Sequence, residues 1–239
     1  MRIIIKYLLC LPLLPLAALP CVSASEKPDA PDMSDPTAVY TSAGMGYGTE
    51  GYNLKLGLQL PDSGDGQAHM ISLEAKEGGD TFRGRYFKVD TTTGFAGSLD
   101  AGYNKDTAMT HISAGVLQTV PLSERFTIYP GLYLGGLIGD QKNIETGTTT
   151  GVDLAALTTT VQIYSKFQVN NKIWINVNPA YTTSLYGIKT NTFDLEASVG
   201  YQITPRLNTR IFHNNNVGVG NYNEDSYESV TRMEFNYAF

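Results

Sequence analysis

Charged side chains recur at alternate positions inside apolar segments of this chain of 239 residues. Alternate residues of a β-strand share one face, so these charges would gather on one polar face while apolar residues take the other. A wall of mixed charges can select small anionic or zwitterionic solutes, or it can pair internally and fill the space that it lines. The sequence leaves both interpretations open for twelve residues: Lys55, Glu74, Lys76, Arg83, Arg85, Asp100, Lys166, Asp194, Glu196, Arg210, Arg232 and Glu234.

Arg83 and Arg85 form the sharpest local feature of this set. Two guanidinium groups on one face of one strand could hold a carboxylate or phosphate bidentately. Pairing with Asp100 or with Glu74 on a neighbouring strand is the stronger interpretation, because the set contains acids at matching positions.

His111 and Ser113 are the only residues in the sequence that suggest an enzymatic function. Nucleophilic serine chemistry needs a histidine within hydrogen-bond reach, and a His-x-Ser pair with a nearby carboxylate resembles the arrangement of outer-membrane lipid A deacylases. In that family the pair faces lipid, whereas here it falls on the more polar side of its segment, and no third member can be identified. Two polar wall residues are the simpler interpretation. No metal-ligand spacing occurs, and the sequence predicts no cofactor.

The amino terminus has the order of a secretory signal peptide. Arg2 and Lys6 precede an apolar run that ends in the small-residue site Val22-Ser23-Ala24, so we expect residues 1–24 to be removed. Both cysteines of the chain lie in this segment. Residues 25–38 are rich in Pro and Asp, without periodicity, and predict a periplasmic tail. The remaining chain has 15 basic and 23 acidic residues, which speaks against nucleic acid as a partner.

From residue 39 onward, apolar and polar residues alternate between turn signals, which predicts an all-β domain over residues 39–239. No later run approaches 18 apolar residues, so only a closed barrel of strands could cross a membrane. The expected strands span residues 39–47, 52–60, 68–76, 80–89, 95–104, 107–120, 126–138, 155–169, 172–186, 192–203, 206–214 and 226–239. The fold predicted is a single transmembrane antiparallel up-and-down β-barrel of about twelve strands, with ten or fourteen as alternatives. The aromatic core of a secreted β-sandwich is the competing interpretation of the same alternation.

The last strand, residues 226–239, alternates charged with aromatic residues and stops on Phe239. This ending resembles the general signature of Gram-negative outer-membrane β-barrel proteins. The resemblance implies that the last strand pairs with residues 39–47, and that Arg232 and Glu234 point into the lumen. It also implies location in the outer membrane, with outer-membrane lipids as partners and the long gaps 139–154 and 215–225 outside the cell.

In size and strand count the chain looks like the twelve-stranded oligosaccharide and nucleoside channels, although none of their motifs is present. The sequence therefore predicts a porin-like channel for small hydrophilic solutes. The alternatives are an outer-membrane lipid-modifying enzyme that uses His111 and Ser113, and a structural or adhesive barrel with a closed lumen. The oligomeric state stays open.

Overall fold

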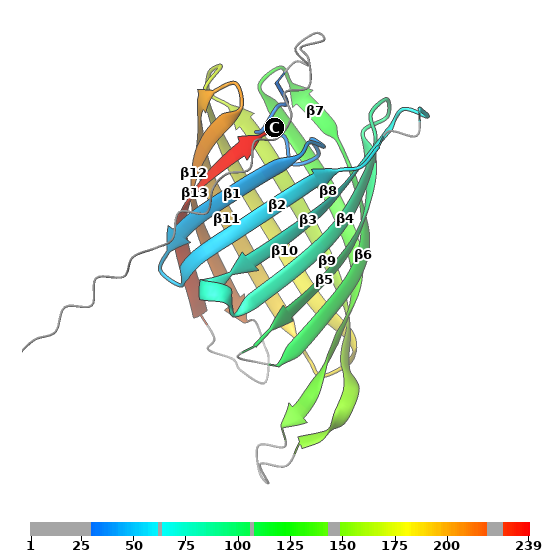
Figure 1. Ribbon diagram of the computed structural model, residues 1–239. Helices are drawn as coiled ribbons and strands as arrows, with labels where there is room; N and C mark the ends of the chain where they lie inside the picture. The colour runs from blue at the N-terminus through cyan, green and yellow to red at the C-terminus, as the bar shows by residue number, and fades with distance from the viewer. Residues whose placement is uncertain (1–29, 62–63, 106–107, 143–148, 219–226) are drawn as a thin grey trace, which may run out of the picture.

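The computed structural model describes residues 30–61, 64–105, 108–142, 149–218 and 227–239, with side chains described outside residues 140–155. Their strands form one closed antiparallel barrel (Figure 1). The strands are β1 (Ser42–Gly48), β2 (Gly51–Gln59), β3 (Gln67–Lys76), β4 (Thr81–Asp90), β5 (Phe95–Asn104), β6 (Met109–Gln118), β7 (Val120–Ser123), β8 (Phe126–Lys142), β9 (Thr149–Gln168), β10 (Ile173–Gly187), β11 (Asn191–Thr204), β12 (Leu207–Gly218) and β13 (Tyr227–Ala238). A 3-10 turn, η1 (Glu77–Gly79), lies between β3 and β4. None of the helical structure in the described residues is long or apolar enough to span a bilayer.

Two pairings close the barrel. β1 pairs with β13 from Ser42 opposite Ala238 to Gly48 opposite Arg232, which confirms the predicted contact between the first and last strands. β6 pairs with β8, and β7 continues β6 beyond the break at Thr119 along the same neighbour. The barrel therefore has twelve strand positions around its circumference, as predicted, because β6 and β7 occupy the same position beside β8. Closure leaves no strand edge with unpaired backbone groups facing lipid.

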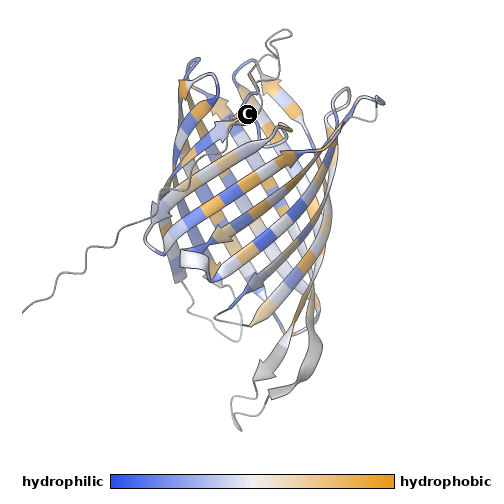
Figure 2. Cartoon of the chain, in the orientation of Figure 1, coloured by the Kyte–Doolittle hydropathy of each residue, from blue (hydrophilic) through white to orange (hydrophobic). Residues whose placement is uncertain are grey.

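Alternation along each strand separates an apolar outer face from a polar lumen (Figure 2). Leu54, Leu56 and Leu58 of β2 are each about half exposed, whereas Lys55 between them lines the interior cavity. β13 behaves in the same way: Phe235 and Tyr237 are exposed outward, while Glu234 is buried inside. This arrangement is that of a transmembrane barrel rather than of a sandwich, whose apolar face would be buried.

Several predicted strand limits were wrong. The predicted gap at residues 139–154 is mostly strand, because β8 extends to Lys142 and β9 begins at Thr149. β12 likewise continues through residues 215–218, and β1 begins at Ser42 rather than at residue 39. Thr-rich and Asn-rich stretches look like loops by composition, but a neighbouring strand supplies their backbone partners and keeps them in the sheet.

The carboxy terminus and the short turns after β2, β4, β7, β9 and β11 lie at one end of the barrel, which we call the terminal rim (Figure 1). The segment of residues 30–41, which we call the strap, leads into β1 at this rim. Part of the strap is buried, including Met33, Ser34 and Thr37. Residues 25–38 were predicted as a periplasmic tail, and the burial of Met33, Ser34 and Thr37 is a finding that alternation alone could not reveal. The predicted signal peptide, residues 1–24, lies outside the described residues.

Candidate functional site

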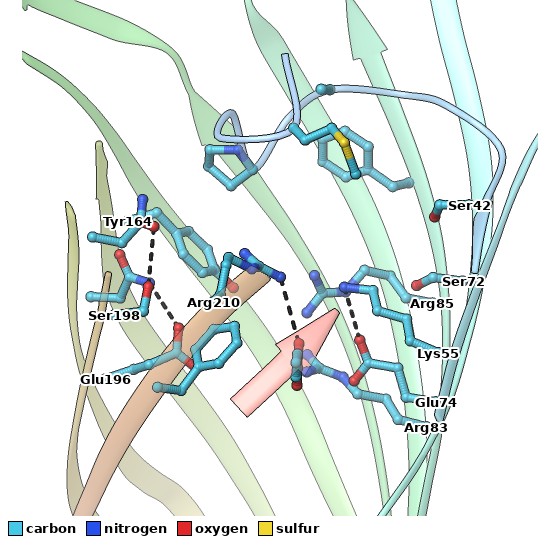
Figure 3. A pocket seen from close by; sticks show the side chains of 18 of the residues that line it. Ser42, Lys55, Ser72, Glu74, Arg83, Arg85, Tyr164, Glu196, Ser198 and Arg210 are labelled. Atoms are coloured by element: carbon cyan, nitrogen blue, oxygen red, sulfur yellow. Dashed lines mark hydrogen bonds and ion pairs between the residues drawn. The ribbon is translucent and has the colours of Figure 1, made fainter. Parts of the chain in front are cut away.

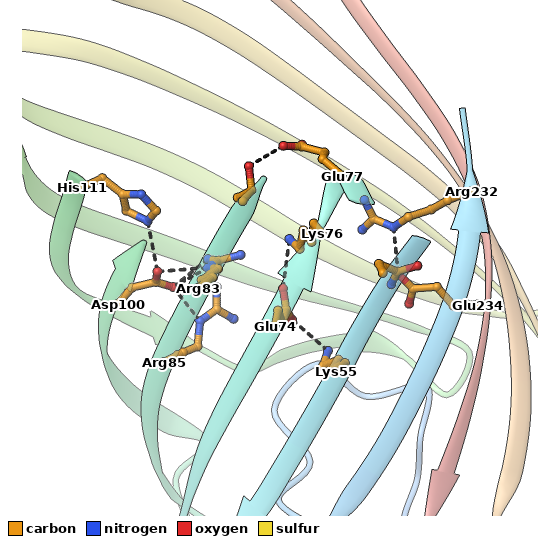
Figure 4. A network of polar contacts seen from close by, with 12 residues as sticks. Lys55, Glu74, Lys76, Glu77, Arg83, Arg85, Asp100, His111, Arg232 and Glu234 are labelled. Atoms are coloured by element: carbon orange, nitrogen blue, oxygen red, sulfur yellow. Dashed lines mark hydrogen bonds and ion pairs between the residues drawn. The ribbon is translucent and has the colours of Figure 1, made fainter. Parts of the chain in front are cut away.

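The lumen has a charged wall, made by inward-facing residues of β2–β6, β12 and β13 (Figure 4). Antiparallel register sets these side chains directly beside one another. Lys55 of β2 stands opposite Glu74 of β3, which stands opposite Arg83 of β4. One register row away, Arg85 of β4 stands opposite Asp100 of β5. Directly opposite side chains in an antiparallel pair lie within contact distance, so register alone builds these charge pairs.

Asp100 is the centre of the largest cluster. Its carboxylate accepts hydrogen bonds from Arg83 Nε at 2.9 Å, from Arg83 Nη2 at 2.6 Å and from Arg85 Nε at 2.8 Å. His111 Nε2 lies 3.2 Å from the same carboxylate. Asp100 is only 6% exposed, whereas each arginine side chain is about 30% exposed. Of the two predicted partners, Asp100 and Glu74, both arginines therefore pair with Asp100.

Glu74 and Glu234 repeat this arrangement. Lys55 Nζ and Lys76 Nζ lie 3.3 and 2.9 Å from the two oxygens of Glu74. Arg232 Nε donates to Glu234 at 2.7 Å, and Arg210 Nη2 lies 3.8 Å from its other oxygen. Each of the three carboxylates is therefore shared by two cations. The ten charged-wall residues are Lys55, Glu74, Lys76, Arg83, Arg85, Asp100, His111, Arg210, Arg232 and Glu234.

Glycine makes room for two of these contacts. A Cβ atom at Gly102 would collide with the ring of His111, which lies over Gly102 and reaches Asp100 on the same strand, β5. A Cβ atom at Gly46 would likewise collide with the side chains of Asn53 and Glu234, which meet in front of it. Lumen-facing glycines therefore leave room for polar side chains of neighbouring strands to lie over them and meet.

The opposite wall carries mainly amides and hydroxyls. Asn176, Asn178, Glu196 and Ser198 of β10 and β11 form what we call the amide wall, and two of its amides bond to the backbone of Ser165 in β9. Ser165 N–H donates to Asn178 Oδ1 at 3.0 Å, and Asn176 Nδ2 donates to the Ser165 carbonyl at 2.7 Å. Pro179 interrupts the ladder between β9 and β10 because it has no N–H, and these side chains replace backbone bonds beside it. Most of the amide wall is thereby used in holding its own strands together.

A cavity of about 230 Å³ lies between the two walls and the strap (Figure 3). Lys55, Arg85 and Arg210 converge on it, as do Tyr133 and Tyr164 from the β8–β9 hairpin. The guanidinium of Arg210 stacks on Phe212, with its central carbon 4.6 Å from the ring centroid, and its buried Nε atom has no hydrogen-bond partner among the described residues. Among the described contacts, Arg85 bonds to Asp100 through Nε alone. Its two terminal guanidinium nitrogens therefore remain on the side of the cavity. N–H groups that are held in place and still have unused hydrogen-bonding capacity can donate to an anionic group.

All twelve predicted residues lie on the inward face of their strands, and nine belong to the charged wall. Glu196 accepts a hydrogen bond from Asn178 Nδ2 at 3.0 Å on the amide wall, and Asp194 accepts one from Asn216 Nδ2 at 2.5 Å nearer the far end of the barrel. Lys166 makes a 2.6 Å ion pair with Asp32 of the strap.

Two contributors were missed by sequence reasoning. The buried amides carry no charge to mark them. The strap lacks periodicity, although Asp32-x-Ser34 and Asp35-x-Thr37 signal successive turns: each Asp side chain accepts the backbone N–H two residues later, at 3.0 and 2.8 Å. Those signals predict local turns but not where the turns dock.

The predicted catalytic alternative gains no support from the geometry. His111 faces the lumen and bonds to Asp100, and no described hydrogen bond joins it to Ser113. The base would have to serve a serine on its own strand while it remains tied to a carboxylate that two arginines already engage. No group of three or more metal-binding side chains occurs in the part of the chain that the structure describes.

No protein-family model and no curated protein matches the sequence. Solved structures do match the fold. The NanC porin superposes with a TM-score of 0.58 at 9% identity, over 83% of this chain and 100% of that chain. The KdgM porin, solved in complex with disordered oligogalacturonate, gives 0.54 at 7% identity over 84% and 99%. The β domain of the Bordetella autotransporter BrkA gives 0.51 at 13% identity over 84% and 97%. At these identities the matches show an outer-membrane barrel fold and do not choose a function.

Proposed function

We propose that this protein is an outer-membrane channel that passes small hydrophilic solutes and prefers anionic or zwitterionic ones. The observation that carries the proposal is the surplus of cations on the charged wall. Six basic side chains share three carboxylates there, and Lys55, Arg85 and Arg210 point toward one cavity from three different strands. Rings of charged side chains set ion selectivity by the sign of the field at a constriction.

The surplus favours this function over a wall of charges that merely fills the barrel. A network of charges that only fills the barrel would pair all of its hydrogen-bond donors internally, as the amide wall does. On the charged wall the basic side chains keep about a fifth to a third of their surface exposed, while two of the acids beneath them are almost fully covered. A solute in the lumen therefore meets the cations first. Glu196 across the lumen adds a negative group that could orient the amine of a zwitterion.

A planar-bilayer measurement tests the proposal. The refolded protein should form channels, and the reversal potential in a potassium chloride gradient should show anion preference. The triple variant Lys55→Gln, Arg85→Gln, Arg210→Gln should shift the reversal potential toward that of a nonselective or cation-preferring pore. Lys172→Gln is the matched control, because Lys172 is an exposed cation in the turn between β9 and β10 and should leave selectivity unchanged. A compact, membrane-inserted barrel that yields no channel events, or that prefers cations, would contradict the function proposed.

A further inference from the structure

The strap makes specific contacts on the far wall of the lumen, although it is joined to β1. Asp32 forms its ion pair with Lys166 of β9, and Ser34 Oγ lies 3.5 Å from Gln168 Oε1 of the same strand. Gln202 Nε2 of β11 lies 3.5 Å from the sulfur of Met33. Lys166, Gln168 and Gln202 all occupy inward-facing positions. The strap therefore crosses the lumen near the terminal rim instead of leaving it.

The strap is also internally ordered. Asp35 N–H donates to the Asp32 carbonyl at 3.1 Å, and Ala38 N–H donates to the Asp35 carbonyl at 3.2 Å. The carboxylates of Asp32 and Asp35 each accept a backbone N–H and a hydroxyl from the residue two positions later, Ser34 and Thr37. Two successive turns closed in this way present a compact body to the lumen, with Met33 only 4% exposed.

The lumen holds an apolar patch where the strap lies. Its buried members are Phe87, Val89, Ala96, Leu117 and Tyr129, and Val39 at the end of the strap packs against them. These residues occupy inward-facing positions of β4, β5, β6 and β8. Apolar side chains facing the water of an open pore would be unfavourable, so the patch indicates a region of the wall that is built to be covered.

The strap forms one boundary of the cavity on which Lys55, Arg85 and Arg210 converge, since Met33, Asp35 and Tyr40 line it together with those cations. Figure 3 shows the strap as a loop across the cavity, on the side away from Glu74 and Arg83. We propose that the strap is a resident gate: it closes the terminal end of the lumen, so that a solute held by the cations leaves only when the strap lifts from Lys166 and the apolar patch. This inference rests on the channel function proposed above.

A reversible crosslink tests the gate. The segment that follows the predicted signal peptide contains no cysteine, so the double variant Ser34→Cys, Gln168→Cys carries the only thiols of the exported chain. A short thiol crosslinker should join the two positions in the folded barrel. Thr160→Cys, Thr182→Cys is the control pair, because those hydroxyls lie 2.8 Å apart between β9 and β10 and do not involve the strap.

The gate predicts that crosslinking the thiols introduced at positions 34 and 168 abolishes channel openings, and that cleaving a reducible crosslinker restores them. Crosslinking the control pair should leave openings unchanged. Deleting residues 30–37 should increase the time spent open, provided that the variant still shows the heat-modifiable mobility of a folded barrel. Equal conductance in the linked and cleaved states would overturn the gate and leave the channel intact. If the thiols at positions 34 and 168 failed to crosslink while the control pair crosslinked, the position of the strap against β9 would be wrong. If the crosslinked protein, the cleaved protein and the deletion variant all gave no channel openings, the channel function itself would be contradicted, and the gate with it.

Discussion

On the charged wall, three carboxylates are shared among six cations, and basic groups remain that face the cavity. On the amide wall, asparagine and serine side chains satisfy one another and the backbone beside Pro179. Both walls are polar and both line the same lumen, but only one has hydrogen-bonding capacity left for a solute. Polarity alone therefore does not mark a functional surface in this barrel. A functional surface is marked instead by hydrogen-bond donors that are held in place but not fully used. Substitutions on the amide wall should therefore change stability, whereas substitutions on the charged wall should also change ion selectivity.

The largest effect is expected at Asp100, which serves both stability and selectivity. Replacing Asp100 with Asn removes the negative charge that holds Arg83 and Arg85 side by side. Loss of a hydrogen-bonded partner costs about 1–3 kcal/mol, and partial exposure of the arginines keeps the cost within that range. The free energy of unfolding measured by urea titration should fall accordingly. Anion preference in bilayers should rise, because two cations lose their counter-charge.

Glu124→Gln is the control for this change, since Glu124 is exposed in the turn between β7 and β8. It should alter neither quantity measurably. If Asp100→Asn destabilised the barrel without moving the reversal potential, the arginines would not lie in the conduction path.

The second prediction concerns Asn176, whose role should be stability alone. Asn176→Ala removes the bond to the Ser165 carbonyl and leaves Ser198 Oγ without its 3.1 Å acceptor. Both sites are buried, so the free energy of unfolding should fall by about 1–2 kcal/mol. Selectivity should stay that of the parent protein. Ser198→Ala gives a graded comparison, because it removes only one of the two bonds and should cost less. A changed reversal potential in either variant would show that the amide wall contacts the permeating solute.

The difference between the walls also shows how far the sequence could lead. Alternation places Lys55, Arg83 and Glu234 on the inner face, because a strand has a period of two residues and lipid excludes charge from the outer face. Twelve strands and the pairing of the first strand with the last followed from the same rule. Alternation cannot tell which inward residues meet, since that depends on the register between neighbouring strands.

Two features therefore needed the structure. The junction at Pro179 arises from the local loss of one backbone donor, and the amides that repair it look like ordinary polar wall residues in the sequence. The strap has no period to detect, and its burial depends on an apolar patch contributed by four other strands. Phe87, Val89 and Leu117, at inward positions of β4 and β6, are members of that patch.

A smaller effect is expected at Glu196, the acidic member of the amide wall. Glu196→Gln keeps an oxygen that can accept the bond from Asn178 Nδ2, so the free energy of unfolding should change by less than about 0.5 kcal/mol. The loss of one negative charge across the lumen should shift the reversal potential modestly toward anions. A large loss of stability would mean that Glu196 is held by its charge rather than by this hydrogen bond, and would place it with the charged wall.

The smallest effect should come from pH, through the ion pair that links Lys166 of β9 to Asp32 of the strap. Burial tends to raise the pKa of Asp32, but Lys166 and the hydrogen bonds from Ser34 outweigh it and hold the pKa below its ordinary value of 3.8. The unfolded state therefore binds more protons than the folded state near that pKa. Stabilisation by the pair is fully present at higher pH and is lost as the pH falls through the lowered pKa of the folded state.

Because the Asp32 side chain is 56% exposed, the pair contributes only about 0–1 kcal/mol to holding the strap. The open fraction of single channels should therefore stay constant from about pH 8 to about pH 5, and should rise only in more acidic solution, where Asp32 takes up its proton. Asp32→Asn should remove that acidic step, since it leaves Lys166 without a titratable partner, and Asp65→Asn in the turn after β2 should retain it. A midpoint between about pH 5 and about pH 8 would assign the control of the strap to a group other than Asp32.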